Sequence, residues 1–171
     1  MYENLKPVFA DVDDYLCLDP ISVEERITNK TKAVMYVGIG GNVGQYQKIV
    51  ELCKKHNLIL ILDAAHMAGT KINNQQVGQD ADLTIFSFQA VKNLPTGDSG
   101  MICFRDDDLD IKARKQAWLG ISKDTYERFN KNSSSYKWKY DVEDVGFIRI
   151  HERLRRLCHS QAFSFWILDQ N

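Results

Sequence analysis

Three short apolar runs, close together in the chain, constrain the fold more than any other feature of the sequence. They are rich in Ile, Leu and Phe and occupy Leu58–Leu62, Leu83–Phe88 and Met101–Phe104. Continuous apolar runs of this length, bounded by polar or glycine-rich segments, are typical of strands buried on both faces of a sheet. The sequence therefore predicts a central sheet in which the three runs are strands.

Upstream of these runs, predicted strands and helices alternate. In 45–56 the apolar residues recur at the spacing of one helical face, and a glycine-rich turn precedes them. The strands are expected at Pro7–Val12 and Lys32–Val37, and the helices from Asp19 or Ser22 to Ile27, over Gln45–His56, over Asp106–Leu119 and over Arg149–Leu168. Between Asp63 and Asp82 we expect a helical turn and a small hairpin or loop. This order predicts an α/β fold, with a mostly parallel sheet flanked by helices.

Chemically useful side chains follow two of the predicted strands. Asp63 comes directly after the first apolar run, and Lys92 follows the second within a few residues. In parallel α/β sheets, ligands bind beyond the carboxyl ends of the strands. If the two strands are parallel neighbours, the carboxylate and the amine share one crevice.

The motifs around these residues resemble a known family. The order is Asp63-Ala64-Ala65-His66, then Phe86-Ser87-Phe88-Gln89-Ala90-Val91-Lys92-Asn93-Leu94, then Gly97-Asp98-Ser99-Gly100, with a weaker match at Pro7-Val8-Phe9. Together they resemble the DegT/DnrJ/EryC1/StrS family of pyridoxal-phosphate-dependent nucleotide-sugar aminotransferases. Each motif alone is common, but their order and spacing are specific.

The resemblance implies the large domain of a fold type I transferase, with pyridoxal 5'-phosphate as its cofactor. By position in the motifs, it implies that Lys92 bonds to the cofactor aldehyde and shuttles the substrate proton. Asp63 would keep the ring nitrogen protonated, His66 would flank the phenolic oxygen, and Ser87 would hold the phosphate. The implied reaction moves an amino group, with glutamate as donor, to a keto nucleotide-sugar.

Each of these residues also has a structural interpretation. Lys92 alone would be a solvated surface lysine, and Asp63 could cap a strand end or a helix. A lone histidine such as His66 is more often structural or exposed, and Ser87 could bond to backbone within its strand. The surrounding motifs favour the cofactor interpretation.

Two other functions stay open. The turn Gly38–Gly44 lies between a predicted strand and helix, as in a dinucleotide-binding Rossmann oxidoreductase, with Asp63 ending the next strand. However, Val43 stands where the third glycine of that motif belongs, and this interpretation leaves Lys92 unused. The third possibility is a binding protein without catalysis.

The resemblance also implies that the chain supplies only the central part of the family's active site. Family members are about twice this length, with an upstream turn for the phosphate and a smaller C-terminal domain. We therefore expect a partial cofactor-binding large domain over 1–147 and a departing, helical segment over 148–171. The intact family is expected to form homodimers, and Ile150 stands where the partner subunit's His or Asn would be.

Composition and charge narrow the remaining classes. The net charge of −1 gives no electrostatic case for nucleic acid or an anionic membrane. No apolar run approaches the roughly 20 residues that span a bilayer, and no secretory signal pattern begins the sequence. The four scattered cysteines indicate buried or partly buried thiols in a reducing compartment. We therefore expect a cytoplasmic protein.

Overall fold

The computed structural model describes residues 5–118, 120–121 and 142–146. They fall into two compact units, the first ending at Arg105 and the second beginning at Asp106. All described strands belong to the first unit, which also carries the predicted site residues. The predictions for the C-terminal helix over 149–168 and for Ile150 lie outside the described residues.

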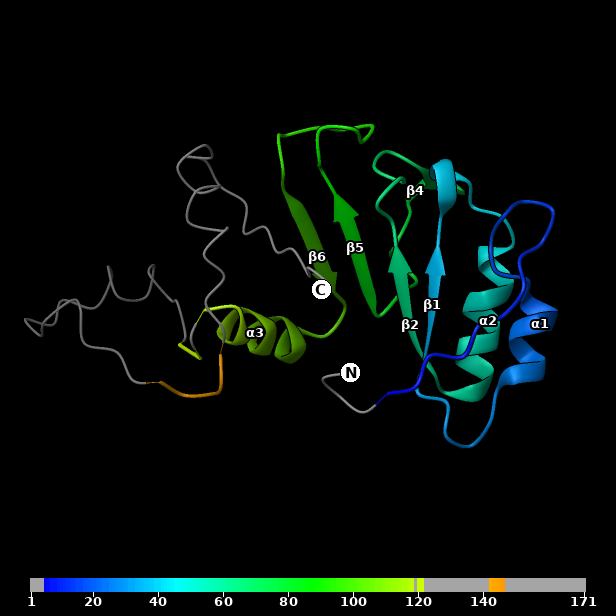
Figure 1. The fold of residues 1–171 in the computed structure, drawn as a ribbon, viewed down its shortest axis with the longest axis horizontal. Helices are drawn as coiled ribbons and strands as arrows, with labels where there is room; N and C mark the ends of the chain where they lie inside the picture. The colour runs from blue at the N-terminus through cyan, green and yellow to red at the C-terminus, as the bar shows by residue number, and fades with distance from the viewer. Residues whose placement is uncertain (1–4, 119, 122–141, 147–171) are drawn as a thin grey trace, which may run out of the picture. The chain divides into compact units, whose positions relative to one another are not determined.

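The first unit is built on a four-stranded sheet with the order β1-β2-β5-β6 (Figure 1). Strands β1 (Ala33–Val37), β2 (Ile59–Asp63) and β5 (Leu83–Ser87) are parallel. Strand β6 (Gly100–Phe104) runs antiparallel to β5. A single loop without a crossover helix joins β5 to β6, so the chain returns in the opposite direction. The mostly parallel sheet and the three apolar strands predicted from the sequence are confirmed.

The helices form where the sequence predicts them. Helix α2 (Tyr46–His56) makes the crossover from β1 to β2, and α1 (Pro20–Arg26) precedes β1. Of the two candidate caps for α1, Asp19 is the one used, because its Oδ1 accepts a hydrogen bond from the Ile21 amide at 3.1 Å. The glycine-rich turn contains a short 3₁₀ helix, η1 (Ile39–Gly41). The predicted hairpin is formed by β3 (Lys71–Ile72) and β4 (Gln75–Gln76).

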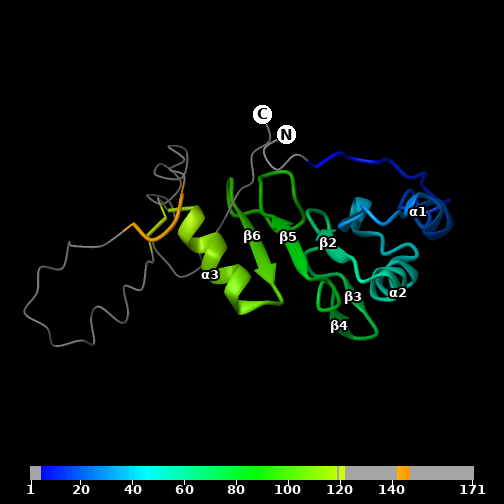
Figure 2. The same cartoon turned by 90° about the horizontal axis from the view of Figure 1, so that it is seen from below.

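The core lies between one face of the sheet and α2. Alternate strand residues point to this face, and Figure 2 shows α2 and the β3–β4 hairpin on the same side of the sheet. The buried side chains include Val34, Tyr36, Leu60, Leu62 and Phe86 from the strands, and Ile49, Val50 and Cys53 from α2. This packing fixes which side chains of each strand face the opposite side.

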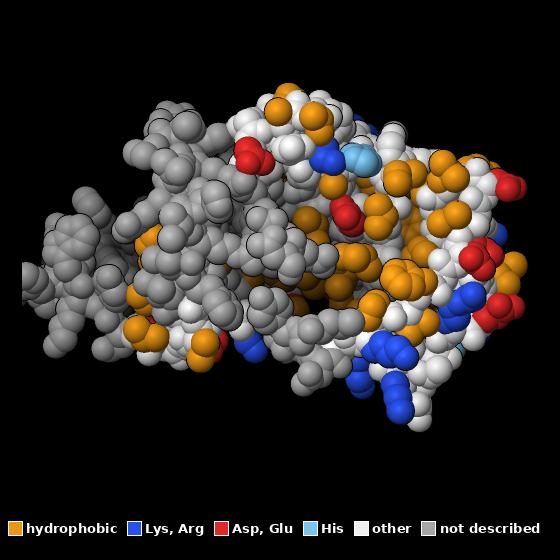
Figure 3. Space-filling model, viewed as in Figure 1, with side chains coloured by type: hydrophobic (Ala, Val, Ile, Leu, Met, Phe, Trp, Pro, Cys, Tyr) orange, Lys and Arg blue, Asp and Glu red, His pale blue; other side chains and the backbone are white. Residues whose placement is uncertain are grey.

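The opposite face of the sheet is open in the described structure. Met35 is 51% exposed, Ile59 47% and Val37 39%. Figure 3 shows hydrophobic side chains gathered over β1 and β2 on this face. The expectation that the apolar runs are strands buried on both faces is therefore wrong for β2, and the neighbouring β1 is exposed on the same face. The physical reason is that the β2–β5 and β5–β6 connections contain no helix in the described structure that could cover this face.

The predicted strand at Pro7–Val12 is also wrong. Within the described residues this segment makes only an isolated bridge, between Val12 and Leu18. Val8 and Phe9 are 68% and 85% exposed. An extended segment becomes a strand only when its backbone pairs with a neighbour, and none of the described strands pairs with this one.

The second unit contains α3 (Asp107–Gln116), close to the predicted helix. Its N-cap is Asp106, whose Oδ1 accepts hydrogen bonds from the amides of Asp108 and Leu109 at 2.8 and 3.1 Å. Lys115 forms an ion pair with Glu143, with Nζ and Oε2 separated by 2.5 Å. Acidic residues in the first turn suit the positive end of the helix dipole, as expected from the sequence.

The cysteines give a first testable prediction. Cys17 and Cys53 are buried, as expected, whereas Cys103 is exposed, and Cys158 lies outside the described residues. Burial, together with the nearby Asp82 charge, raises the pKa of Cys53 to about 11. Because the thiolate is the reactive form, we expect iodoacetamide to label Cys103 at least tenfold faster than Cys53 at neutral pH. Peptide mass analysis of the folded chain measures both rates. Equal rates at the two cysteines would contradict the burial of Cys53 between α2 and the sheet. As the control, both cysteines should react at similar rates when the chain is unfolded in urea.

Candidate functional site

The candidate site lies where three segments leave the carboxyl ends of the parallel strands. β1 leads into the turn Gly38–Gly44, β2 into Asp63–His66, and β5 into the loop that carries Lys92. The pairing β1-β2-β5 makes these ends neighbours. The condition set by the sequence analysis, that the strands before Asp63 and Lys92 are parallel neighbours, is met.

The side chains of Lys92 and His66 contact each other across two of these segments. Lys92 Nζ and His66 Nε2 are 2.8 Å apart. The other ring nitrogen, Nδ1, accepts a hydrogen bond from the Gly40 amide at 3.2 Å. His66 is exposed and Lys92 is half-buried, so a ligand can reach both. One residue from each strand end therefore takes part in a single contact network.

The loop that carries Lys92 is ordered by its own hydrogen bonds. The Lys92 amide donates to Gln89 O at 2.9 Å, and the Thr96 amide donates to Phe88 O at 2.9 Å. At the base of the loop, the Phe88 amide donates to Ser99 O at 2.7 Å, and the hydroxyls of Thr96 and Ser99 are hydrogen-bonded to each other. These bonds fix the backbone position from which the Lys92 side chain extends.

A second hydrogen bond ties this loop to the segment after β2. Asn93 Nδ2 donates to the Ala68 carbonyl at 2.5 Å. The tether joins the residue next to Lys92 to the residue two positions after His66. It therefore helps to set the distance between the amine and the ring.

Asp63 is the last residue of β2 and points to the open face of the sheet. Its register partners are Val37 in β1 and Ile85 in β5. Its Oδ1 accepts a hydrogen bond from the Ala65 amide at 3.0 Å, which fixes the turn that leads to His66. Among the described residues, no hydrogen bond to Oδ2 is present, so that oxygen is available to a ligand. One carboxylate oxygen of Asp63 therefore stabilises the turn, and the other can bind a ligand.

Ser87 ends β5 on the same face as Asp63, by the alternation of side chains along the strands. Its hydroxyl oxygen accepts a long hydrogen bond from the Gln89 amide, at 3.4 Å. The hydroxyl proton is then free to be donated to an anion. The prediction that Ser87 binds phosphate stays a prediction.

The glycine turn is packed tightly against its surroundings. A Cβ on Gly38 would lie 2.0 Å from Met67 Sδ, so any larger residue here would displace the buried Met67 side chain. The hydroxyl of the buried Tyr36 donates a hydrogen bond to the Val43 carbonyl at 2.9 Å, which stabilises the turn. Burial, followed by hydrogen bonding with Cys17, raises the pKa of Tyr36, so the phenol stays neutral and remains a donor.

Sequence reasoning misses the role of Gly40 and underrates Asn93. The sequence places Gly40 either in a dinucleotide-binding motif or, by the family resemblance, in a turn near the nucleotide-sugar site, whereas in the structure its amide donates to His66. Asn93 appears in the sequence only as part of the motif around Lys92, but in the structure its side chain joins two loops. No sequence signal identifies the Gly40 contact, because it joins residues 26 positions apart through a backbone amide.

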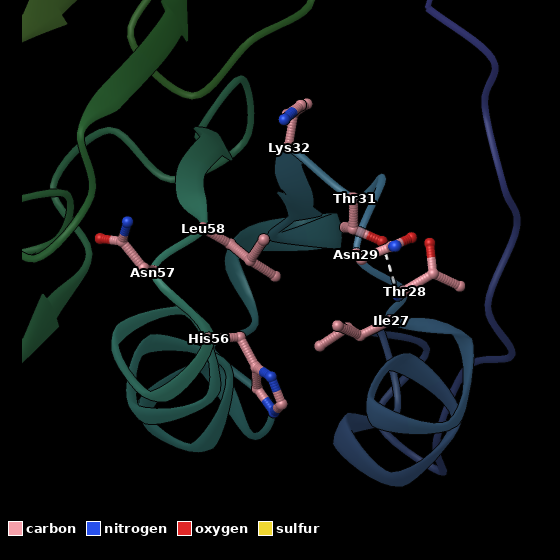
Figure 4. Close-up of a pocket in the computed structure, with 8 residues that line it drawn as sticks. All are labelled: Ile27, Thr28, Asn29, Thr31, Lys32, His56, Asn57 and Leu58. Carbon is pink, nitrogen blue, oxygen red and sulfur yellow. Dashed lines mark hydrogen bonds between the residues drawn. The ribbon is translucent and has the colours of Figure 1, made fainter.

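A separate hollow of about 440 Å³ lies at the opposite ends of the strands. Figure 4 shows the side chains of Lys32 and Asn57 pointing away from its centre, while His56 points toward Ile27. His56 also lies 3.7 Å from the Glu24 carboxylate. Polar groups therefore do not converge here as they do around Lys92. In the described part of the chain, no group of three or more His, Cys, Asp or Glu side chains could hold a metal ion.

Comparison with known proteins identifies the class that this geometry defines. The model of the DegT/DnrJ/EryC1/StrS aminotransferase family matches residues 1–146. The chain belongs to this family. Because the family model covers most of the chain, the Rossmann alternative is not retained. Among the described helices, none is long and apolar enough to cross a membrane.

Individual relatives are similar over most of this chain. Spore coat polysaccharide biosynthesis protein SpsC from Bacillus subtilis is 39% identical over 148 residues, which are 86% of this chain and 37% of SpsC. The structure of DesI in the presence of its TDP-sugar product is 31% identical with a TM-score of 0.63, over 74% of this chain and 32% of DesI. The structure of ntda from Bacillus subtilis with bound cofactor PMP is 26% identical with a TM-score of 0.63, over 82% of this chain and 29% of that chain. This chain thus spans well under half the length of these relatives.

Proposed function

We propose that this chain carries the cofactor-binding centre of a pyridoxal-phosphate-dependent sugar aminotransferase. The observation that carries the proposal is the contact of Lys92 Nζ with His66 Nε2 at 2.8 Å, between the segments that follow two adjacent parallel strands, one of which ends at Asp63. Family membership supports it, and the PMP bound in a related structure supports the same cofactor chemistry here.

The described residues fit pyridoxal 5'-phosphate by their donor set. The half-buried Lys92 offers an amine for the aldehyde, and Asp63 offers a carboxylate oxygen for the ring nitrogen. His66 lies next to the amine, where it can donate to an oxygen on the ring. Ser87 has a hydroxyl proton for the phosphate. When bound, this cofactor supplies an electron sink that makes a hydrogen next to nitrogen acidic.

Each residue then has a role set by its own chemistry. The Lys92 amine holds the cofactor and, once released, moves a proton to and from the substrate carbon. The Asp63 carboxylate favours a positive charge beside it. The Asn93 tether and the hydrogen bonds of the lysine loop keep the amine within reach of these groups. Positioning of this kind contributes a large share of catalysis in enzymes with reactive side chains.

The substrate is proposed to be a keto nucleotide-sugar and the donor glutamate. DesI was solved with a TDP-sugar product, and SpsC is named for polysaccharide biosynthesis, which supports sugar chemistry. We further propose that residues 1–147 are a partial large domain, that 148–171 departs from the family pattern, that the intact enzyme is a homodimer and that it is cytoplasmic. We also propose that full turnover requires parts of the family's length beyond the 37% of SpsC that this chain matches.

The experiment that tests this function is cofactor capture by the chain. When pyridoxal phosphate is added to the purified protein, we expect a new band in the visible absorbance spectrum, because the Lys92 amine bonds to the aldehyde of the cofactor. Borohydride reduction and peptide mass analysis should then place the cofactor-derived mass on Lys92. The absence of any Lys92 label would instead favour a non-catalytic remnant.

Replacing Asp63 with asparagine tests the role of its charge. The asparagine side chain would keep an oxygen for the Ala65 amide, so we expect the fold and cofactor capture to survive. The ring nitrogen of the bound cofactor would lose a neighbouring negative charge, and its pKa should fall by about 1–3 units. Nuclear magnetic resonance of ¹⁵N-labelled cofactor against pH measures this shift. Unfolding of Asp63→Asn would instead show that the carboxylate is mainly structural.

A further inference from the structure

The outer edge of β1 is unpaired in the described structure. The sheet order β1-β2-β5-β6 places β1 at one edge, and β2 is its strand neighbour among the described residues. Of the described helices in the first unit, only α2 packs on β1, and Figure 2 shows α2 against the face of the sheet rather than its edge. An open strand edge presents a row of backbone N–H and C=O groups that can pair with another strand.

The hydrogen bonds to β2 show which backbone groups of β1 point outward. The Ile59 amide donates to Lys32 O at 3.1 Å, and the Gly38 amide donates to Asp63 O at 3.2 Å. Successive residues of a strand direct their N–H and C=O groups to opposite sides, so the even-numbered residues of this segment bond to β2. The residues of β1 whose N–H and C=O groups point to the open edge are Ala33, Met35 and Val37.

The side chains of the same residues lie on the open apolar face. Met35 is 51% exposed and Val37 39%, whereas Tyr36 between them is fully buried against the core. No residue from Ala33 to Val37 is charged, and none is a proline. Charged side chains and prolines are among the usual means by which edge strands avoid pairing. Both the backbone and the side chains of β1 are therefore open to a partner.

We propose that the outer edge of β1 is an acceptor site for one further strand, which adds to the sheet beside Ala33–Val37. The outward N–H and C=O groups of β1 bond to an extended segment of about five residues. One side of the added strand continues the core face and the other continues the open apolar face, so apolar side chains suit both sides. The partner is therefore an extended, uncharged and apolar segment without proline at its bonding positions.

The source of this strand is the part of the family's length that this chain does not match. The matched residues are 37% of SpsC, 32% of DesI and 29% of ntda. Each of these relatives therefore has more than half of its length outside the match, from which a strand can come. The interaction uses none of the side chains assigned to the cofactor, so it goes beyond the proposed function.

The test uses the whole chain and synthetic peptides. Overlapping peptides cover the part of SpsC that the chain does not match, each long enough for a strand of about six residues with its flanks. The peptides that bind are then followed by hydrogen exchange of the backbone amides, measured by nuclear magnetic resonance. We expect bound peptide to slow exchange at the amides of Ala33, Met35 and Val37 by about tenfold or more, because each gains a hydrogen bond.

Alternate amides of the same strand are the control. The amides of Val34 and Tyr36 already bond to β2, so the peptide should change their exchange much less. Binding by none of the peptides would overturn the proposal, as would protection at β6 in place of β1. Exchange at Met35 that slows with rising chain concentration, without peptide, would show that a second copy occupies the edge and would also overturn it.

Met35→Pro tests the backbone pairing directly. It removes an outward N–H but no bond to β2, so we expect the chain to stay folded by circular dichroism and peptide affinity to fall about tenfold or more. Met35→Ala keeps this N–H and should keep most of the binding. Equal affinity of both variants would overturn the proposal. If Met35→Pro unfolds, Met35→Lys keeps the backbone and adds an edge charge, and the same loss of binding is expected.

None of these measurements uses pyridoxal phosphate. Failure of peptide binding therefore counts against the acceptor site alone, and failure of cofactor capture at Lys92 counts against the proposed function alone.

Discussion

Replacing Lys92 with alanine is expected to remove all covalent capture of pyridoxal phosphate by this chain. Lys92 is the lysine whose amine the structure brings to the ends of β2 and β5, 2.8 Å from His66. A reversible bond between an amine and an aldehyde is lost with the amine, because neither histidine nor aspartate can form it. After borohydride reduction, the amount of cofactor-labelled protein should fall to background in this variant.

Lys71→Ala is the matched control. Lys71 is an exposed lysine in β3, outside the cluster of Lys92, Asp63 and His66. Its replacement should leave the label on Lys92 unchanged. If Lys92→Ala kept the same amount of label, now spread over surface lysines, the site would be wrong. Urea unfolding of both variants shows whether loss of label follows loss of structure.

Replacing Leu62 with alanine is expected to give the largest loss of stability. Leu62 is fully buried in β2, and the neighbouring strands β1 and β5 lead to the other segments of the candidate site. Removing a buried leucine side chain costs about 2–5 kcal/mol, through lost transfer energy and the cavity left behind. That is a large share of the stability of a small domain. The midpoint of urea unfolding, followed by circular dichroism, should fall accordingly.

Ile59→Ala, on the same strand, is the control for this prediction. Ile59 faces the open side of the sheet and is 47% exposed, so its truncation should cost less than about 1 kcal/mol. The two variants remove similar apolar groups from opposite faces of one strand. Equal losses would mean that another part of the protein covers the open face, and the assignment of one buried face would have to be revised.

Much of the fold could be predicted because the relevant signals are local. The apolar runs of β2, β5 and β6 are short and clearly bounded, and the helical spacing in α2 is regular. The cap at Asp19 and the first-turn acids of α3 are likewise local. The strand at Pro7–Val12 failed because pairing is not local: the segment has strand-like composition but makes only a bridge between Val12 and Leu18 in the described structure.

For the candidate site, too, the local features could be predicted from the sequence and the non-local ones could not. The sequence by itself determined the residue types and the family motifs, from Asp63 and His66 to Ser87 and Lys92, because both motifs are contiguous in the chain. Family membership confirms that resemblance, whereas the roles of the individual residues remain predictions.

Only the tertiary structure decided how these groups meet. The parallel pairing of β1, β2 and β5 brings three loop segments to one edge of the sheet. There the Gly40 amide and the Lys92 amine approach the same His66 ring from opposite nitrogens. A backbone amide has no sequence signature, and a hydrogen bond depends on distances of a few tenths of an ångström, which are set by packing across the strands.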